Sequence, residues 1–379
     1  MKLFDVYPLM PVNIVKAKNC KLWDENGTEY LDFYGGHAVI SVGHSHPFYV
    51  GKIKNQLDKI GFYSNSVINK LQEELAEKLG KISEFEDYNL FLCNSGAEAN
   101  ENALKIASFI SGKKKFITFK NSFHGRTSAA VAATDDPSIV APVNETSNFI
   151  FCEWNNVEEF EKLFFENIQD LAGVIIEGIQ GIGGIQIPSQ ELMSKISELC
   201  VENSVFFISD EIQSGYARSG KFFAHQYFNV KPDIITTAKG MANGFPIGGV
   251  LVSSKIPAKH KMLGTTFGGN HLACAAAIAV LEIISNENLV EESLQKGKYL
   301  VQKLNEIPRV KEIRGKGLLI GIDFEIPASQ VSKILREEFK IFVGSASNPL
   351  TMRLLPPLTI SYPEMDYLIS SLQSVLNSI

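Results

Sequence analysis

The sequence predicts an α/β fold with a mostly parallel sheet, because short apolar runs alternate with amphipathic helical stretches through the middle of the chain. In such folds helices cover both faces of the sheet, and ligands bind at the carboxyl ends of the strands. The expected strands are Leu90–Cys93, Lys115–Phe119, Phe149–Cys152, Gly173–Glu177, Val205–Asp210, Asp233–Thr237 and Gly248–Ser253. The clearest helices between them are Glu98–Ile110, Val157–Glu166 and Glu191–Glu202.

The two ends of the chain predict a smaller α+β domain. Near the C-terminus a helix precedes two strands joined by glycines, and near the N-terminus two short strands flank an Asn26-Gly27 hairpin signal. We therefore expect a large domain at residues 46–275 and a small domain formed by residues 1–45 with 276–379. The C-terminal elements are a helix from about Leu289 to Glu306 and the strands Val310–Ile313 and Leu318–Phe324 around Gly315 and Gly317, and the N-terminal strands are Cys20–Trp23 and Tyr30–Asp32.

The composition is that of an ordinary globular protein, with 379 residues, 45% of them hydrophobic and 21% charged. A net charge of −6 argues against nucleic acid or an anionic membrane as the main partner. Five scattered cysteines without a C-x-x-C pair favour buried thiols in a reducing compartment over disulfides or a zinc site. No apolar leader is visible, and the most apolar stretch, Leu272–Ile284, is too short to span a bilayer, so we expect a cytoplasmic protein.

Two segments that follow predicted strands offer groups for binding a ligand. Residues 94–97 form a small turn that opens a helix, so their N–H groups and the Ser95 hydroxyl can bind a phosphate. An ordinary helix N-cap is the alternative. After the next strand, Phe123 can stack on a planar ligand and Arg126 can clamp a carboxylate, the alternative being a solvated surface turn.

Two further segments offer groups for catalysis. Asp210 ends a strand at the carboxyl edge of the sheet, where a buried carboxylate needs a cation such as a protonated pyridinium nitrogen, unless it only caps a helix. Lys239 ends another apolar strand beside Gly240, where burial would make its amine nucleophilic toward a carbonyl, although most lysines are simply exposed. Together, a phosphate cradle, a stacking aromatic ring, an acid and a lysine on one sheet edge are the parts of a pyridoxal-phosphate site.

Two other motifs predict no site. Residues 215–222 nearly match the nucleotide-binding pattern G-x-x-x-x-G-K-[ST], but the last position is Phe222, which has no hydroxyl for magnesium, and no helix obviously begins there. His44 and His46 suggest a metal, but Pro47 follows and no cysteine or histidine cluster completes a site, so a structural turn is expected.

Longer stretches of the sequence resemble the class III, fold-type I aminotransferases. The resemblance covers nearly the whole chain and implies a large domain with a mostly parallel seven-stranded sheet, a smaller α+β domain, and pyridoxal 5′-phosphate as cofactor. Within the class, the compact length and the segments around Gly35 and residues 122–127 are most similar to the acetylornithine and succinylornithine aminotransferases. The motifs that carry the resemblance are residues 210–220, Lys239-Gly240 with residues 244–249, and residues 35–39, 43–47, 314–317 and 353–357.

The resemblance implies a role for each candidate residue. Lys239 carries the cofactor through its amine and, once released, moves a proton between the substrate carbon and the cofactor. Asp210 pairs with the pyridine nitrogen, Gln213 bonds the ring 3-oxygen, and Phe123 stacks on the ring. The phosphate is held by Ser95, Gly96 and Ala97, together with Thr266 of the partner subunit, which implies a homodimer with a shared active site.

The resemblance also implies the substrates. Arg126 binds the α-carboxylate of an N-acylornithine, Arg353 binds that of 2-oxoglutarate or glutamate, and Glu177 belongs to the same substrate-binding group. The terminal amine passes to the cofactor and leaves an acylglutamate semialdehyde, and 2-oxoglutarate then becomes glutamate, a reversible reaction of arginine biosynthesis.

The sequence departs from the family pattern in residues 177–184. Gly178 stands where the family has proline, which indicates a local change of backbone. Ile182 stands where the family has a glutamate that commonly pairs with the arginine at the position of Arg353. An unmasked Arg353 would favour a substrate with a second carboxylate, so we expect N-succinylornithine to be preferred over N-acetylornithine.

Other functions share parts of this pattern. Ornithine, 4-aminobutyrate and diaminobutyrate aminotransferases, and some decarboxylases, have most of the same motifs. A non-catalytic domain built on this fold would be expected to lack Lys239 or Asp210, and both are present.

Overall fold

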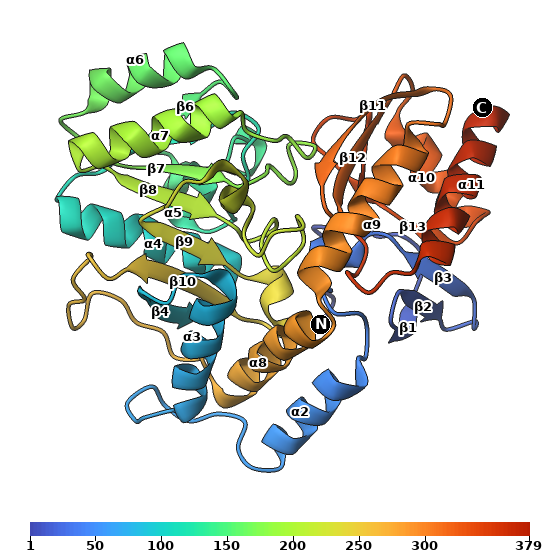
Figure 1. Ribbon diagram of the computed structural model, residues 1–379, viewed down its shortest axis with the longest axis horizontal. Helices are drawn as coiled ribbons and strands as arrows, with labels where there is room; N and C mark the ends of the chain where they lie inside the picture. The colour runs from blue at the N-terminus through green and yellow to red at the C-terminus, as the bar shows by residue number, and fades with distance from the viewer.

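The computed structural model describes residues 1–379, and its largest element is a seven-stranded sheet (Figure 1). The strand order is β4-β10-β9-β8-β7-β5-β6. Only β10 runs antiparallel to its neighbours, so the predicted mostly parallel sheet is confirmed. The strands are β4 (Tyr88–Cys93), β5 (Lys115–Phe119), β6 (Phe149–Cys152), β7 (Leu171–Glu177), β8 (Phe206–Asp210), β9 (Ile234–Thr237) and β10 (Gly248–Ser253).

Helices cover both faces of this sheet because its buried strands are apolar on both sides. In β7, Val174 and Ile176 pack into the cluster that includes α6 and α7, whereas Ile175 packs into the cluster that includes α4. The three helices predicted between the strands form, each within about a turn of its expected ends. The helices of this region are α2 (Pro47–Leu57), α3 (Lys70–Ser83), α4 (Gly96–Ser111), α5 (Ser128–Ala132), α6 (Val157–Asn167), α7 (Gln190–Asn203) and α8 (His271–Asn286), and the short 3₁₀ helices are η1 (Pro137–Ile139), η2 (Pro142–Asn144), η3 (Ala224–Phe228) and η4 (Lys239–Ala242).

Two smaller four-stranded sheets with helices lie beside the large sheet, one with the order β1-β2-β3-β13 and one with the order β11-β12-β15-β14 (Figure 1). The N-terminal strands join the C-terminal part of the chain where Leu31 of β3 pairs with Ile341 of β13. One expectation was wrong: Gly315 lies inside β11, with φ +151, and only Gly317 lies in the turn. The domain boundaries stay a prediction. The elements are β1 (Ile14–Lys18), β2 (Lys21–Asp24), β3 (Glu29–Asp32), α1 (Gly35–Ala38), α9 (Leu289–Leu304), β11 (Val310–Lys316), β12 (Leu319–Phe324), α10 (Ala328–Glu337), β13 (Ile341–Phe342), β14 (Gly344–Ser345), β15 (Thr351–Leu354) and α11 (Tyr362–Ser378).

The apolar stretch at Leu272–Ile284 forms most of α8. None of the helices, taken alone, combines the length and the apolar composition that a membrane-spanning segment needs. Together, α8 and α9 have the length and apolar composition of a membrane span, but they bend by 65° at their junction. The apolar side chains of α8 are buried in the main core.

Glycines allow α9 to approach the turn between β11 and β12. A Cβ on Gly297 of α9 would lie 2.1 Å from the backbone oxygen of Gly317. A Cβ on Gly317 would lie 2.4 Å from the backbone carbon of Ser219, in the loop after β8. Backbone therefore packs on backbone where the C-terminal sheet meets the large sheet's loops, and no side chain fits at either glycine.

We expect Gly297→Ala to lower the free energy of unfolding by about 1–3 kcal/mol, because the added methyl group must push two backbone segments apart. Thermal unfolding at one scan rate measures the loss. Gly51→Ala in α2 is the matched control, since nothing lies within 4 Å of a Cβ there. The control should be neutral or more stable by about 0.4–1 kcal/mol. Equal midpoints for the two variants would contradict the packing argument.

Candidate active site

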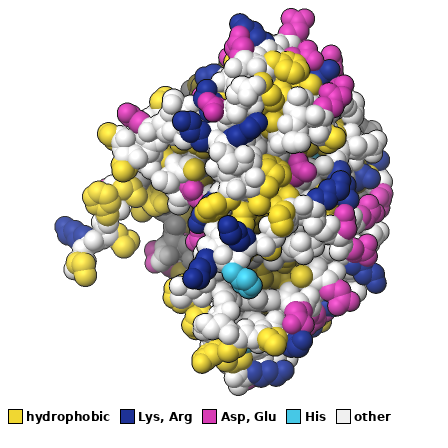
Figure 2. Space-filling view, turned by 90° about the vertical axis from the view of Figure 1, so that its left-hand side faces the viewer, with side chains coloured by type: hydrophobic (Ala, Val, Ile, Leu, Met, Phe, Trp, Pro, Cys, Tyr) yellow, Lys and Arg dark blue, Asp and Glu magenta, His cyan; other side chains and the backbone are white.

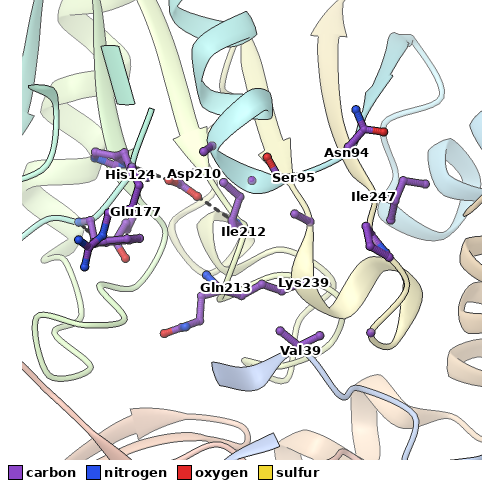
Figure 3. A pocket seen from close by; sticks show the side chains of 18 of the residues that line it. Val39, Asn94, Ser95, His124, Glu177, Asp210, Ile212, Gln213, Lys239 and Ile247 are labelled. Carbon is purple, nitrogen blue, oxygen red and sulfur yellow. Dashed lines mark hydrogen bonds and ion pairs between the residues drawn. The ribbon is translucent and has the colours of Figure 1, made fainter. Parts of the chain in front are cut away.

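A cavity of about 360 Å³ lies at the carboxyl ends of the central strands (Figure 3). Most of the residues that line it follow β4, β5, β8 and β9, the positions that the sequence singled out. Most of the predicted site residues lie in this one cavity. They are Ser95, Gly96, Ala97, Phe123, Arg126, Glu177, Asp210, Gln213 and Lys239.

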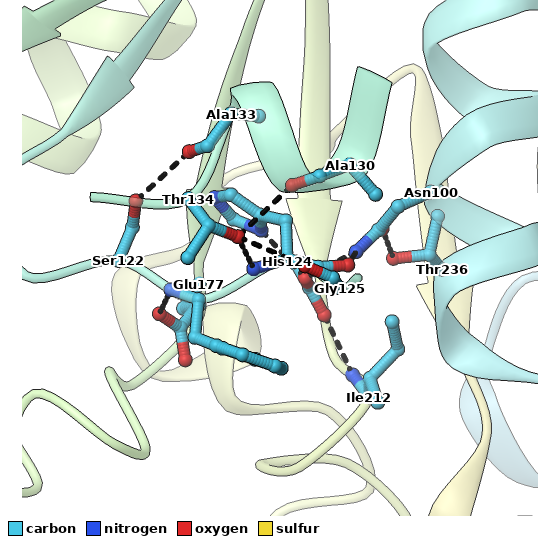
Figure 4. A network of polar contacts seen from close by, with 12 residues as sticks. Asn100, Ser122, His124, Gly125, Ala130, Ala133, Thr134, Glu177, Ile212 and Thr236 are labelled. Atoms are coloured by element: carbon cyan, nitrogen blue, oxygen red, sulfur yellow. Dashed lines mark hydrogen bonds and ion pairs between the residues drawn. The ribbon is translucent and has the colours of Figure 1, made fainter. Parts of the chain in front are cut away.

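Asp210 is buried at the end of β8 and is held by hydrogen bonds from three parts of the chain, whose residues Asn100, His124 and Ile212 are labelled in Figure 4. Asn100 Nδ2 donates to its Oδ2 at 2.7 Å, and His124 Nδ1 lies 2.7 Å from the same oxygen. Oδ1 accepts a bond from the N–H of Ile212 at 3.0 Å. Thr236 on β9 holds Asn100 in turn, donating to its Oδ1 at 2.7 Å. These donors stabilise a charged carboxylate away from water, which an apolar pocket alone would not do.

Lys239 lies across the cavity from this carboxylate, in the turn after β9 (Figure 3). Its backbone is left-handed, with φ +40. Desolvation lowers the pKa of Lys239, and Asp210 and Glu177 only partly offset this effect. A lowered pKa leaves more of the amine unprotonated and nucleophilic.

The start of α4 forms a cradle for an anion. Ser95 is its N-cap, and its Oγ accepts a bond from the N–H of Glu98 at 3.2 Å. Gly96 and Ala97 begin the helix, so their N–H groups have no carbonyl one turn earlier within the helix to bond. A Cβ on Gly96 would lie 2.8 Å from Ile212 Cγ2, so the close approach of these two loops requires glycine.

Glu177 is buried at the end of β7, and both of its oxygens bind backbone. Oε1 accepts a bond from the N–H of Phe123 at 3.0 Å, and Oε2 accepts one from the N–H of Gly181 at 2.8 Å. It thus fixes the loop that carries Phe123. Burial raises the pKa of Glu177 from 4.5 to about 7, although His124 and the two N–H groups oppose the shift.

The structure places the two arginines differently. Arg126 is exposed, lines the cavity and makes no ion pair. Arg353 on β15 lies outside the cavity lining and is 1% exposed. It donates from Nη1 to Gln213 Oε1 at 3.1 Å and from Nε to the carbonyl of Ser345. No carboxylate forms an ion pair with Arg353, and desolvation lowers its pKa to about 10.

Thr266 does not line the cavity of its own chain and is exposed. The loop that carries it nevertheless packs beside the cradle, where Asn94 Nδ2 donates to Thr265 Oγ1 at 3.4 Å. This places an exposed threonine next to the phosphate cradle but outside it.

Sequence reasoning missed Asn100, His124 and Thr236, which hold Asp210 in place. Asn100 lies in α4 between apolar residues and is fully buried, so a polar residue on an apolar helix face was the available signal. His124 directly follows Phe123, in a segment that the sequence had already singled out.

The two motifs for which the sequence predicted no site do not line the cavity. His44 bonds Asp32 at 2.8 Å, and His46 bonds Glu287 at 2.9 Å, so each histidine has its own carboxylate. No α-helix follows residues 215–222, where the chain continues into η3. No group of three or more potential ligands could hold a metal ion.

The donor set fits pyridoxal phosphate. An anion cradle, an aromatic ring at Phe123, a carboxylate held ready for a cation and an amine of lowered pKa share one cavity. One oxygen of Asp210 has only the N–H of Ile212 as partner, so it can still accept a bond from a protonated ring nitrogen.

Comparison with known proteins leads to the same class. The family model of the class-III aminotransferases matches residues 5–376. An acetylornithine aminotransferase of Bacillus subtilis is 40% identical over 383 residues, covering 99% of this chain and 97% of that protein. An acetylornithine aminotransferase of Archaeoglobus fulgidus is 39% identical, and the match covers 96% of this chain and 95% of that protein. An aminotransferase structure from Bacillus anthracis has a TM-score of 0.92 at 29% identity, and the match covers 99% of this chain and 96% of that chain.

The chain therefore belongs to the class-III aminotransferases, and its fold-type I architecture is confirmed. It is a pyridoxal-phosphate-dependent transaminase. The ornithine aminotransferase of Toxoplasma gondii has a TM-score of 0.92 at 29% identity, and the match covers 99% of this chain and 91% of that chain. That structure shows partial occupancy of pyridoxal phosphate at the active site.

We expect Asn100→Ala to weaken pyridoxal-phosphate binding and to lower stability by about 1–3 kcal/mol, because a buried carboxylate loses a donor. Titration of cofactor-free protein with pyridoxal phosphate measures the first effect, and chemical unfolding measures the second. Asn102→Ala is the matched control, since its Nδ2 donates to Glu98 O at 2.8 Å on the same helix without touching Asp210. If both variants bind the cofactor equally, Asn100 does not support Asp210 as described.

The raised pKa of Glu177 predicts a dependence of stability on pH. Between pH 4.5 and about 7, Glu177 keeps its proton in the folded chain and releases it in the unfolded chain. The contribution of the neutral carboxyl group to the free energy of unfolding is therefore complete below pH 4.5 and is lost as the pH rises through about 7. Glu177→Gln removes the titration. In cofactor-free protein, the stability of wild type minus variant should fall by about 3 kcal/mol across this range. Thermal unfolding at several pH values tests this, and a difference independent of pH contradicts it.

Proposed function

We propose that this transaminase moves the terminal amine of an N-acylornithine to 2-oxoglutarate, in arginine biosynthesis. The observation that carries the proposal is the similarity to acetylornithine aminotransferases, at 36–40% identity over nearly the full length of each chain. The arginines beside the cavity support it, because both substrates carry carboxylates.

The residues around the cavity would divide the work as follows. When bound, the cofactor acts as an electron sink for the carbon that carries the amine. Lys239 would hold the cofactor through its amine and, once released, would move the proton that this carbon loses. Asp210 keeps the ring nitrogen protonated, and Phe123 and Gln213 hold the ring face and its 3-oxygen. Ser95, Gly96 and Ala97 hold the phosphate.

Arg126 and Arg353 would bind the substrate carboxylates, with Glu177 near them. Arg126 is a free cation at the cavity, suited to the α-carboxylate of the acylornithine. Arg353 has only neutral hydrogen-bond partners, so a carboxylate of 2-oxoglutarate would be its first anionic partner. The lack of a paired carboxylate at Arg353 supports a preference for N-succinylornithine over N-acetylornithine.

A homodimer would complete the site, with Thr266 of the partner subunit on the phosphate. Exposed apolar side chains are available for such an interface, among them Leu57, Tyr63, Ile68 and Phe267. Figure 2 shows one face on which apolar side chains gather among lysines, arginines and carboxylates. The cytoplasmic location stays a prediction, supported by five free and buried cysteines.

The test is the absorbance spectrum of purified protein before and after addition of N-succinylornithine. We expect a cofactor band that changes as the amine is transferred, and a higher kcat/KM for the succinyl than for the acetyl compound. A band that changes only with ornithine, 4-aminobutyrate or diaminobutyrate would keep the cofactor and overturn the substrate.

Arg126→Ala should lower kcat/KM for the acylornithine by roughly 10- to 100-fold, since a charge-assisted bond worth about 1.5–3 kcal/mol is lost. Arg336→Ala on α10 is the control, because that arginine pairs with Glu337 away from the cavity. Unchanged kcat/KM for Arg126→Ala would exclude it as the clamp.

A further inference from the structure

Asn243 ties the loop after Lys239 to a distant segment of the chain. It is buried, and its backbone is left-handed, with φ +49. Its Oδ1 accepts bonds from the N–H groups of Ser41 at 2.9 Å and Val42 at 3.0 Å. Its Nδ2 donates to Gly43 O at 2.9 Å. One side chain thus binds three consecutive residues that lie about two hundred positions away.

The distant segment binds back to the turn that carries the lysine. Ser41 Oγ donates to Gly240 O at 2.8 Å, and the Tyr49 hydroxyl donates to Ala242 O at 2.8 Å. We call these five hydrogen bonds the Asn243 clamp. They hold both ends of η4 (Lys239–Ala242) against residues 41–49.

The turn that carries Lys239 needs such support from its neighbours. β9 ends at Thr237, so Lys239 is beyond the sheet's hydrogen bonds. Its left-handed backbone, with φ +40, is unfavourable for a residue with a side chain, by about 1–2 kcal/mol. Strained backbone persists only where the surroundings hold it in place.

The clamp also links two sides of the cavity. Val39, two residues before Ser41, lines the cavity together with Lys239, and both are labelled in Figure 3. Asn243 itself does not line the cavity. Loss of the Asn243 side chain would therefore loosen the turn that carries Lys239 without removing a side chain that lines the cavity.

We propose that Asn243 is a positioning residue, which keeps the Lys239 amine aligned for proton transfer by clamping η4 to residues 41–43. The inference rests on the proposed function in that Lys239 moves the proton. A small misalignment of a reacting group can slow a step by up to about 100-fold, so loss of the clamp should lower kcat more than it changes KM.

The test compares Asn243→Gly with Asn229→Gly. Glycine accepts the left-handed backbone and removes only the side chain's bonds. Asn229 is the matched control, with φ +53 at an exposed position and no side-chain hydrogen bond. Ser41→Ala removes one clamp bond from the opposite side, and should show the same changes to a smaller degree.

Two measurements on the holoenzyme separate positioning from a loss of folded protein. With an acylornithine deuterated at the carbon that carries the amine, Asn243→Gly should show a kcat lower by about 10- to 100-fold and a larger isotope effect on kcat. A merely structural defect lowers the active fraction and leaves the isotope effect unchanged. Wild-type kcat and isotope effect in Asn243→Gly overturn the proposal.

Two measurements on cofactor-free protein do not depend on the amine substrate. Hydrogen exchange at residues 41–43 and 240–242 should be faster in Asn243→Gly than in Asn229→Gly. Uptake of pyridoxal phosphate by Lys239, followed by absorbance, should be slower. If wild type rejects every acylornithine, the proposed function fails, yet slower uptake with faster exchange still supports the clamp. Equal uptake and equal exchange in the two variants overturn it.

Discussion

The buried carboxylate of Asp210 is the constraint on which the arrangement of the site depends. A charge at this depth is costly unless donors surround it, and no single element supplies them. Asn100 comes from α4, His124 from the loop after β5, and Thr236 from β9 through Asn100. These elements must therefore meet at the end of β8, and the strand order brings them there. The same meeting point places the phosphate cradle and Lys239 around one cavity.

Gly178 packs against a second buried pair, which includes the residue that follows Asp210. Glu211 Oε1 lies 2.8 Å from His225 Nδ1, and both side chains are fully buried. A Cβ on Gly178 would lie 2.5 Å from that same oxygen. The N–H of Gly178 also donates to the backbone oxygen of Asp210 at 3.1 Å, a bond that a proline could not make. Since Glu211 directly follows Asp210, this packing also fixes the end of β8.

The sequence predicted what depends on local pattern and strand ends. Each strand of the large sheet was visible as an apolar run, and the rule that ligands bind at carboxyl ends then singled out Asp210 and Lys239. Asn100 could not be predicted as a partner of Asp210, because the two lie 110 residues apart and only tertiary packing joins them. Gly315 was misassigned to a turn because glycine also serves within a strand, where φ reaches +151. The roles of the site residues stay predictions.

Ile182 and Arg353 belong to one structural feature, although they lie far apart in the sequence. The Ile182 carbonyl accepts a bond from the N–H of Ser347 at 2.8 Å, and the carbonyl of Ser345 accepts one from Arg353 Nε. Position 182 therefore lies against the loop that orients this arginine. With isoleucine there, the neighbours that bind the guanidinium are carbonyl and amide oxygens, which orient it but do not neutralise it. Burial without an ion pair leaves Arg353 with a lowered pKa, and its hydrogen bonds to neutral oxygens do not balance its charge.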